Sequence, residues 1–197
     1  MTRTMLDLCS GLGGASQSML DHGWDVVRIE DNDALQFVPS TWIMDINDLN
    51  VENYDEIDKV DLVWASPPCL EFSQAFNAPA PKAQREGRNF SPDLSLVERC
   101  KTIIEDVNPT YWCIENVVGA IKPLQPVLGN PRMIVGPYVL WGNFPFFECN
   151  PGSFPTKAEK DVWSSDPLRA NKKAKVPYEL SDLLRQAIES QTSIFDY

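Results

Sequence analysis

The sequence predicts an α/β fold, with a Rossmann-like, mostly parallel central sheet and helices on both faces. Short apolar strands alternate with amphipathic helical patterns along the chain. The first strand runs directly into a glycine-rich turn and then a helix. Polar residues follow several strands at once, at the edge where open α/β sheets bind ligands. We therefore expect one domain over residues 1–197, with its site at the carboxyl edge of the sheet.

The composition narrows the functional classes. The chain has 197 residues and is 43 % hydrophobic, which is enough for a real core. No apolar run approaches the roughly 18 residues that a membrane span needs, and the N-terminus does not resemble a signal peptide. Five scattered cysteines without a CxxC pair favour reduced thiols in a cytosol-like compartment and argue against zinc. We expect a cytoplasmic protein without a metal site.

The net charge of −11 gives no general attraction to nucleic acid. Charge alone favours a small-molecule substrate or a protein partner. DNA binding would have to rely on two local basic patches: Lys82, Arg85 and Arg88 in residues 82–88, and the Arg169 to Lys175 cluster in residues 169–175. A solvated, charged segment explains either patch equally well.

The first unit carries the glycine-rich turn. Residues 4–8 read as a strand and residues 15–22 as a helix, with Gly23 at the position just after the helix. Between them, Gly11, Gly13 and Gly14 would let the backbone approach a ligand closely, and the helix N-terminus offers free N–H groups. This arrangement is typical of nucleotide and nucleoside sites.

The next two strands each end in a carboxylate. Glu30 ends the strand at residues 25–30, the position at which nucleoside-cofactor folds hold ribose hydroxyls, and Asp31 and Asp33 are neighbours that could share this role. Asp45 lies near the end of the strand at residues 42–46. It could accept a hydrogen bond from an adenine amino group, or it could simply cap a turn.

Two later strands end in reactive residues. The strand at residues 61–65 leads into Pro67, Pro68 and Cys69, and the prolines rigidly aim a thiol into the expected cleft. The strand at residues 111–114 is followed by Glu115, which we expect to be buried. If these strands are neighbours, Cys69 and Glu115 share one cleft; an inert buried cysteine and a surface acid are the alternatives.

The remaining segments have weaker signals. They are expected as an acidic surface helix and turn over residues 55–61, a functional loop over 70–92, a helix from Ser91 and Pro92 to about Asp106, a hairpin over 132–144 that breaks at Gly136-Pro137, an irregular stretch over 150–175, and a last amphipathic helix from Val176.

Taken together, the strand ends resemble the motifs of the DNA (cytosine-5) methyltransferase family. The resemblance covers most of the chain. Its parts are Asp7-Leu8-Cys9-Ser10-Gly11-Leu12-Gly13-Gly14, Glu30, Asp45, Pro67-Pro68-Cys69 with Phe72-Ser73, Glu115-Asn116-Val117, and the segment from Val176-Pro177 into the last helix.

The resemblance implies an S-adenosylmethionine-dependent methyltransferase fold and methyl transfer to C5 of cytosine, with S-adenosylhomocysteine as product. It assigns the covalent bond to cytosine C6 to Cys69, the contact with N3 to Glu115, and a catalytic arginine, less directly, to Arg132. The cofactor residues it implies are Asp7, Leu8, Cys9, Gly11, Leu12, Gly13, Gly14, Glu30, Asp31, Asp45, Ile46 and Pro67. DNA is the expected substrate; RNA, a free cytosine nucleotide and a non-catalytic relative remain alternatives.

The chain also departs from the family pattern. Leu70 stands where the family has Gln after the catalytic cysteine, and the Gln-Arg-x-Arg motif is not evident, with Arg132 as its nearest equivalent. No segment is long enough for a target recognition domain. A protein partner or a homodimer would then supply target recognition, in the setting of a phage or a restriction-modification system.

Overall fold

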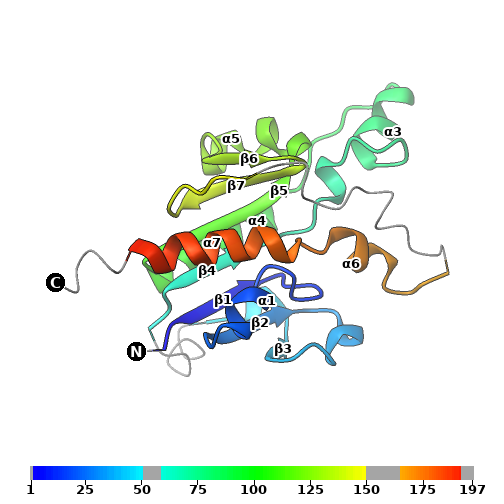
Figure 1. The fold of residues 1–197 in the computed structure, drawn as a ribbon. Helices are drawn as coiled ribbons and strands as arrows, with labels where there is room; N and C mark the ends of the chain where they lie inside the picture. Colours follow the sequence, from blue (N-terminus) through cyan, green and yellow to red (C-terminus); the bar gives the residue numbers. More distant parts are fainter. Residues whose placement is uncertain (1, 51–58, 150–164, 192–197) are drawn as a thin grey trace.

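The computed structural model describes residues 2–50, 59–149 and 165–191. Its centre is a seven-stranded sheet in the order β3-β2-β1-β4-β5-β7-β6 (Figure 1). Neighbouring strands from β3 to β5 pair in parallel, and β7 pairs antiparallel with both β5 and β6. The strands are β1 (Thr4–Leu8), β2 (Asp25–Glu30), β3 (Thr41–Ile43), β4 (Leu62–Ala65), β5 (Tyr111–Val117), β6 (Met133–Val135) and β7 (Tyr138–Asn143).

Helices cover both faces of the sheet, as the sequence predicts. On one face α7 lies beside α1, and α4 lies on the other (Figure 1). The helices are α1 (Gln17–Asp21), α3 (Pro79–Arg85), α4 (Ser95–Val107), α5 (Ile121–Leu128), α6 (Arg169–Ala174) and α7 (Tyr178–Gln191); the short 3-10 helices are η1 (Asp33–Leu35), η2 (Ile46–Asp48), η3 (Leu70–Phe72) and η4 (Val118–Ala120). Within the described ranges, no helix combines the length and the apolar character that a membrane crossing requires.

Alternate residues of the strands pack into the two main hydrophobic cores. In β1, Met5 faces the core that contains Leu180 and Leu184 of α7, while Leu6 and Leu8 face the core that contains Ile103 of α4. All three β1 side chains are fully buried. This is the pattern of a parallel strand covered on both sides, and it explains why such strands read as continuous apolar runs.

Two expectations about the carboxyl edge are confirmed. β4 and β5 are neighbours, with Ala65 opposite Ile114. Glu115 is buried, with 9 % of its surface exposed, although it lies inside β5 rather than just after it. The hairpin is also confirmed, because β6 and β7 flank Gly136-Pro137.

Three expectations about the other segments are corrected. The stretch over 70–92 is not a continuous loop, because it contains η3 and α3; two prolines suggested a loop, yet Pro79 occupies the first turn of α3, where proline is tolerated. Helix α4 begins at Ser95 and not at Ser91. The basic residues of 169–174 form α6 rather than an irregular segment. The helix expected over 55–61 falls mostly outside the described residues.

The close pairing of β5 and β7 gives a test of the sheet. A β-carbon on Gly142 would lie 2.0 Å from the carbonyl oxygen of Trp112, whereas one on Gly23 would meet nothing within 4 Å. Gly142→Ala must therefore push two paired strands apart. We expect it to lower the free energy of unfolding by about 1–3 kcal/mol more than Gly23→Ala does, as measured by urea denaturation. Equal losses in the two variants would contradict this packing.

Candidate active site

The glycine-rich turn is held against the end of β2. Cys9 and Gly11 have left-handed backbone angles, with φ of 55° and 53°. The Gly11 N–H donates a hydrogen bond of 2.7 Å to Oε2 of Glu30, and the other carboxylate oxygen accepts from the Asn32 N–H at 3.2 Å. One carboxylate therefore orders both the turn after β1 and the chain after β2.

The last segment of the chain crosses directly over the glycine-rich turn. A β-carbon on Gly14 would lie 2.4 Å from the carbonyl oxygen of Val176 and 2.7 Å from the side chain of Lys175. A larger residue at position 14 would displace this segment. The family resemblance includes the segment beginning at Val176 among its motifs, and the structure places that segment against Gly14.

A buried polar network lies beneath the turn. Ser16 Oγ donates a 2.5 Å hydrogen bond to Oδ2 of Asp7 and accepts a 2.8 Å bond from Nε of Arg28. Arg28 Nη1 donates to the carbonyl of Pro39 at 2.6 Å. Asp7 and Arg28 are both fully buried. The network connects β1, the start of α1, β2 and the loop before β3.

Burial governs the protonation of this network. It raises the pKa of Asp7 to about 7, against the opposing effects of the Ser16 hydrogen bond and the positive charge of Arg28. Burial also lowers the pKa of Arg28. Oδ1 of Asp7 has no hydrogen-bond partner among the described residues, which is consistent with a carboxyl that takes up a proton readily.

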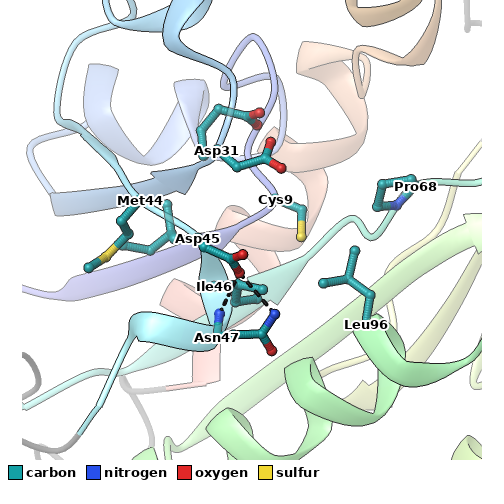
Figure 2. Close-up of a pocket in the computed structure, with 10 residues that line it drawn as sticks. Cys9, Asp31, Met44, Asp45, Ile46, Asn47, Pro68 and Leu96 are labelled. Atoms are coloured by element: carbon teal, nitrogen blue, oxygen red, sulfur yellow. Dashed lines mark hydrogen bonds between the residues drawn. The ribbon is translucent and has the colours of Figure 1, made fainter.

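An open pocket lies at the carboxyl ends of β1, β2 and β3, with a volume of about 180 Å³. Figure 2 shows Cys9, Pro68 and Leu96 on one side of it and Asp45 and Asn47 on the other. Oδ1 of Asp45 accepts hydrogen bonds from the backbone and side-chain nitrogens of Asn47, at 2.8 and 2.9 Å. Asp45 therefore caps η2 and also lines the pocket, so its two readings from the sequence are compatible.

The pocket brings together part of the predicted cofactor set. Its lining includes Cys9, Glu30, Asp31, Asp45 and Ile46. It does not include Asp7, Leu8, Gly11, Leu12, Gly13, Gly14 or Pro67. Lining residues that the sequence analysis did not assign to the cofactor set are Ile29, Met44, Asn47, Pro68 and Leu96.

Sequence reasoning also missed the Asp7–Ser16–Arg28 network. A signal was available, because Arg28 interrupts the otherwise apolar run Val26-Val27-Arg28-Ile29. A charged residue within a buried strand needs a partner nearby. That partner could have been sought at Asp7, on the neighbouring strand, because Asp7 pairs with Arg28 in register.

The turn after β4 is locked to β5. Nδ2 of Asn116 donates a buried 3.0 Å hydrogen bond to the carbonyl of Pro67. Cys69 is half-buried and immediately precedes η3. A β-carbon on Gly119 would lie 2.1 Å from the carbonyl oxygen of Phe72, so η3 packs tightly against η4. The segment that carries Cys69 is thus fixed at two points to the end of β5.

Glu115 lies on β5 one residue beyond Ile114, which pairs with the last residue of β4. Its negative charge affects the pKa values of two neighbouring groups. Burial, followed by the negative charge of Glu115, raises the pKa of Tyr138 to about 12, and the same two causes raise the pKa of the Cys113 thiol. Cys69 and Glu115 therefore come from adjacent strands at the same edge of the sheet.

Arg132 lies elsewhere. It immediately precedes β6, two strands away from β5. Its guanidinium carbon is 4.3 Å from the ring centroid of Phe146 and 5.4 Å from that of Phe144. These rings follow the end of β7, beside the first residues of β5. The structure thus directs Arg132 away from the edge that carries Cys69 and Glu115.

The two basic patches both lie beyond the carboxyl ends of the parallel strands, at the right of Figure 1. Lys82 and Arg85 are exposed on α3, and Arg88 forms an ion pair with Glu86. On α6, Lys172 donates a 2.6 Å hydrogen bond to Asp166. Glu86 and Asp166 therefore oppose the positive charges of Arg88 and Lys172 locally.

The raised pKa of Asp7 predicts a pH dependence of stability. The folded protein keeps a proton on Asp7 up to about pH 7, whereas an unfolded chain loses it near pH 4. Stability that is present below about pH 4 is therefore lost as the pH rises through 7. Relative to Asp7→Asn, the natural protein should lose free energy of unfolding between about pH 4 and pH 7. Urea denaturation across that range measures the difference, and a constant difference would contradict the assignment.

A search of curated proteins found no match. Many solved structures are similar to this chain, among them the following two. One is a putative DNA modification methyltransferase encoded within an E. coli prophage, with 19 % identity and a TM-score of 0.49 over 72 % of this chain and 46 % of that one. The other is the S. pombe Dnmt2 methyltransferase, with 23 % identity and a TM-score of 0.42 over 65 % of this chain and 40 % of that one.

The chain thus spans less than half the length of either solved relative. The family model for C-5 cytosine-specific DNA methylase matches residues 3–126, a range that runs from β1 through the glycine-rich turn, the Pro-Cys turn and Glu115 into α5. Families of this kind are S-adenosylmethionine-dependent in general. On this match, the chain belongs to the C-5 cytosine-specific DNA methylase family.

Proposed function

We propose that this chain transfers a methyl group from S-adenosylmethionine to C5 of cytosine in DNA, through a covalent bond between Cys69 and C6. One observation carries the proposal. The half-buried Cys69 and the buried Glu115 come from neighbouring parallel strands, and the Asn116–Pro67 hydrogen bond joins the two segments. Such a pair at the carboxyl edge of an α/β sheet supports nucleophilic catalysis on a bound base.

The two side chains divide the chemistry. C5 of cytosine is a poor nucleophile, so the Cys69 thiolate first forms a bond to C6. Glu115, as the carboxylic acid, donates a proton or a strong hydrogen bond to N3, which takes up the electron pair displaced from the ring. The resulting enamine is nucleophilic at C5. After C5 is methylated, a base removes H5, the electrons return to the C5–C6 bond, and the Cys69 thiolate leaves.

The pocket residues fit a nucleoside cofactor. Glu30 and Asp45 offer carboxylate acceptors to ribose hydroxyls and to an adenine amino group, and Ile46 and Leu96 offer apolar surface between them. Because Gly14 has no side chain, the segment that begins at Val176 can pack closely against the turn. When bound, S-adenosylmethionine supplies an electrophilic methyl group on a sulfonium.

The way in which the chain contacts its nucleic-acid substrate is part of the same proposal. Residues 1–197 form one catalytic domain in this proposal, with contacts to DNA from α3 and α6, or from a protein partner or second copy. Arg132 fits this scheme least well, because its guanidinium stacks on Phe144 and Phe146. Methylation of RNA or of a free cytosine nucleotide uses the same two residues and is the alternative.

Cofactor binding tests the pocket independently of the chemistry. Calorimetric titration should show saturable binding of S-adenosylhomocysteine. Glu30→Gln should weaken it by roughly 10- to 100-fold, because a neutral amide replaces the charged acceptor. Glu98→Gln changes an exposed acid on α4 and should bind like the natural protein. Absence of binding at millimolar ligand would refute the cofactor assignment, and equal binding by Glu30→Gln would refute the role of Glu30.

Trapping with 5-fluorocytosine tests the nucleophile. Fluorine at C5 cannot leave as a proton, so elimination stops and the protein stays bound to the methylated base. Cys69→Ser should abolish the adduct, because a hydroxyl has a far higher pKa than a thiol. Glu115→Gln should slow adduct formation by at least roughly 100-fold, because an amide cannot protonate N3.

Cys149→Ala is the matched control for the trapping experiment, because Cys149 is half-buried like Cys69 but follows β7. It should form the adduct normally. A peptide map of the trapped complex locates the modified residue. An adduct on another cysteine, or methyl transfer by Cys69→Ser at the natural rate, would overturn the mechanism.

A further inference from the structure

An exposed aromatic ring with a cation on it lies on the segment that follows the Pro-Cys turn, seven residues after Cys69. The side chain of Phe76 is 72 % exposed. The guanidinium carbon of Arg85 lies 3.8 Å from the centroid of its ring. A phenylalanine ring that is this exposed lacks much of the stabilisation that burial would give. Arginine and ring together form a flat, cationic surface whose second ring face is available to a ligand.

The ring stands on an anchored support. Ala78 immediately precedes α3 and Ala83 lies within it. Both are almost fully buried, as is Phe72 before them. A turn closed by the hydrogen bond from the Ala78 N–H to the Ala75 carbonyl, at 2.8 Å, carries Phe76 between these points. The exposure of Phe76 therefore belongs to an ordered segment.

The neighbouring surface continues both the apolar and the basic character. Leu70 on η3 is 64 % exposed and Val118 on η4 is 52 % exposed, and η3 contacts both η4 and α3. Residues 76–90 contain three cations and one anion, in a chain whose net charge is −11. Apolar contact surface and local positive charge thus coincide next to Cys69.

We propose that Phe76 and Arg85 form a stacking platform for an unpaired nucleobase, so that the chain binds single-stranded nucleic acid next to its active site. An aromatic ring with an arginine and nearby cations is the combination that binds unpaired strands, because each base offers a face to stack and each nucleotide a phosphate. In a duplex the base faces are covered by stacking on one another. A protein ligand would not need the cations.

The position of the platform suits the proposed reaction, on which this inference rests. Phe76 is seven residues from Cys69, which limits their separation to about 25 Å. A strand of a few nucleotides could place one base on Phe76 and another at Cys69. The platform therefore assigns an unpaired strand as the substrate class of the site. With an unpaired strand as substrate, no energy is needed to extract the target base from a duplex.

The test measures binding of a fluorescent single-stranded oligodeoxynucleotide containing cytosine, by anisotropy, with S-adenosylhomocysteine present. The natural protein should bind the single strand more tightly than the matched duplex. Phe76→Ala should weaken single-strand binding by roughly 5- to 150-fold, while Phe76→Trp, which keeps a ring, should retain it. Because Phe76 is exposed, the alanine variant should fold normally. Phe37→Ala, at a ring that is 63 % exposed on another part of the surface, should bind like the natural protein.

Salt dependence separates stacking from charge. Phe76→Ala should leave the slope of log affinity against log salt unchanged, because the ring carries no charge. Lys82→Gln should reduce the slope by about 0.7, the value of one single-strand phosphate contact. Tighter binding of the duplex, equal binding by Phe76→Ala and the natural protein, or a self-association that Phe76→Ala abolishes would each overturn the platform.

The same samples distinguish this inference from the proposed function. Transfer of a labelled methyl group to duplex DNA, single-stranded DNA and a cytosine nucleotide is measured in parallel. Methyl transfer without Phe76-dependent strand binding would overturn the platform and leave the function standing. Phe76-dependent strand binding without transfer to any of the three would support the platform and refute the function.

Discussion

The buried guanidinium of Arg28 is the interaction on which the geometry of the first half of the sheet depends. Through Ser16 it reaches Asp7, and directly it reaches the carbonyl of Pro39. A buried charge that loses its partners is strongly destabilising, so these groups must stay together. Gly13 has no side chain, and one would collide with the guanidinium. Because Arg28 lies directly against Gly13, satisfying this one buried charge also holds the glycine-rich turn in place.

In the second half of the sheet, different contacts hold the segments together. Here the Asn116–Pro67 hydrogen bond and the close approach of Gly119 to Phe72 join the segments. The turn that carries Cys69 and the strand that carries Glu115 therefore keep one relative position. The glycine-rich turn is held through a buried charge, and the Pro-Cys turn through a side-chain hydrogen bond and close backbone packing; β1 and β4 join the two halves as neighbours.

The sequence predicts those features that depend on local pattern. Apolar strands followed by Gly11 or by Pro67-Pro68 revealed the α/β fold, the pairing of β4 with β5 and the burial of Glu115. Contacts between distant side chains could not be read in the same way. Ser16 looks like an ordinary helix residue until Arg28 is placed beneath it. Helix α3 was hidden because prolines signal loops more often than first helical turns, and the stack of Arg85 on Phe76 depends on that helix.

The packing of α7 on α1 has a consequence for the order in which the chain can fold. Ser18 and Trp24 at the two ends of this contact bond to Asp182 and Glu189, more than 160 residues away. During synthesis, the apolar side of α1 with Met19 remains uncovered until Leu180 and Leu184 have left the ribosome. Contacts this distant in sequence form slowly, and the uncovered face is open to aggregation in the meantime. The nascent chain thus depends on α7 to protect α1.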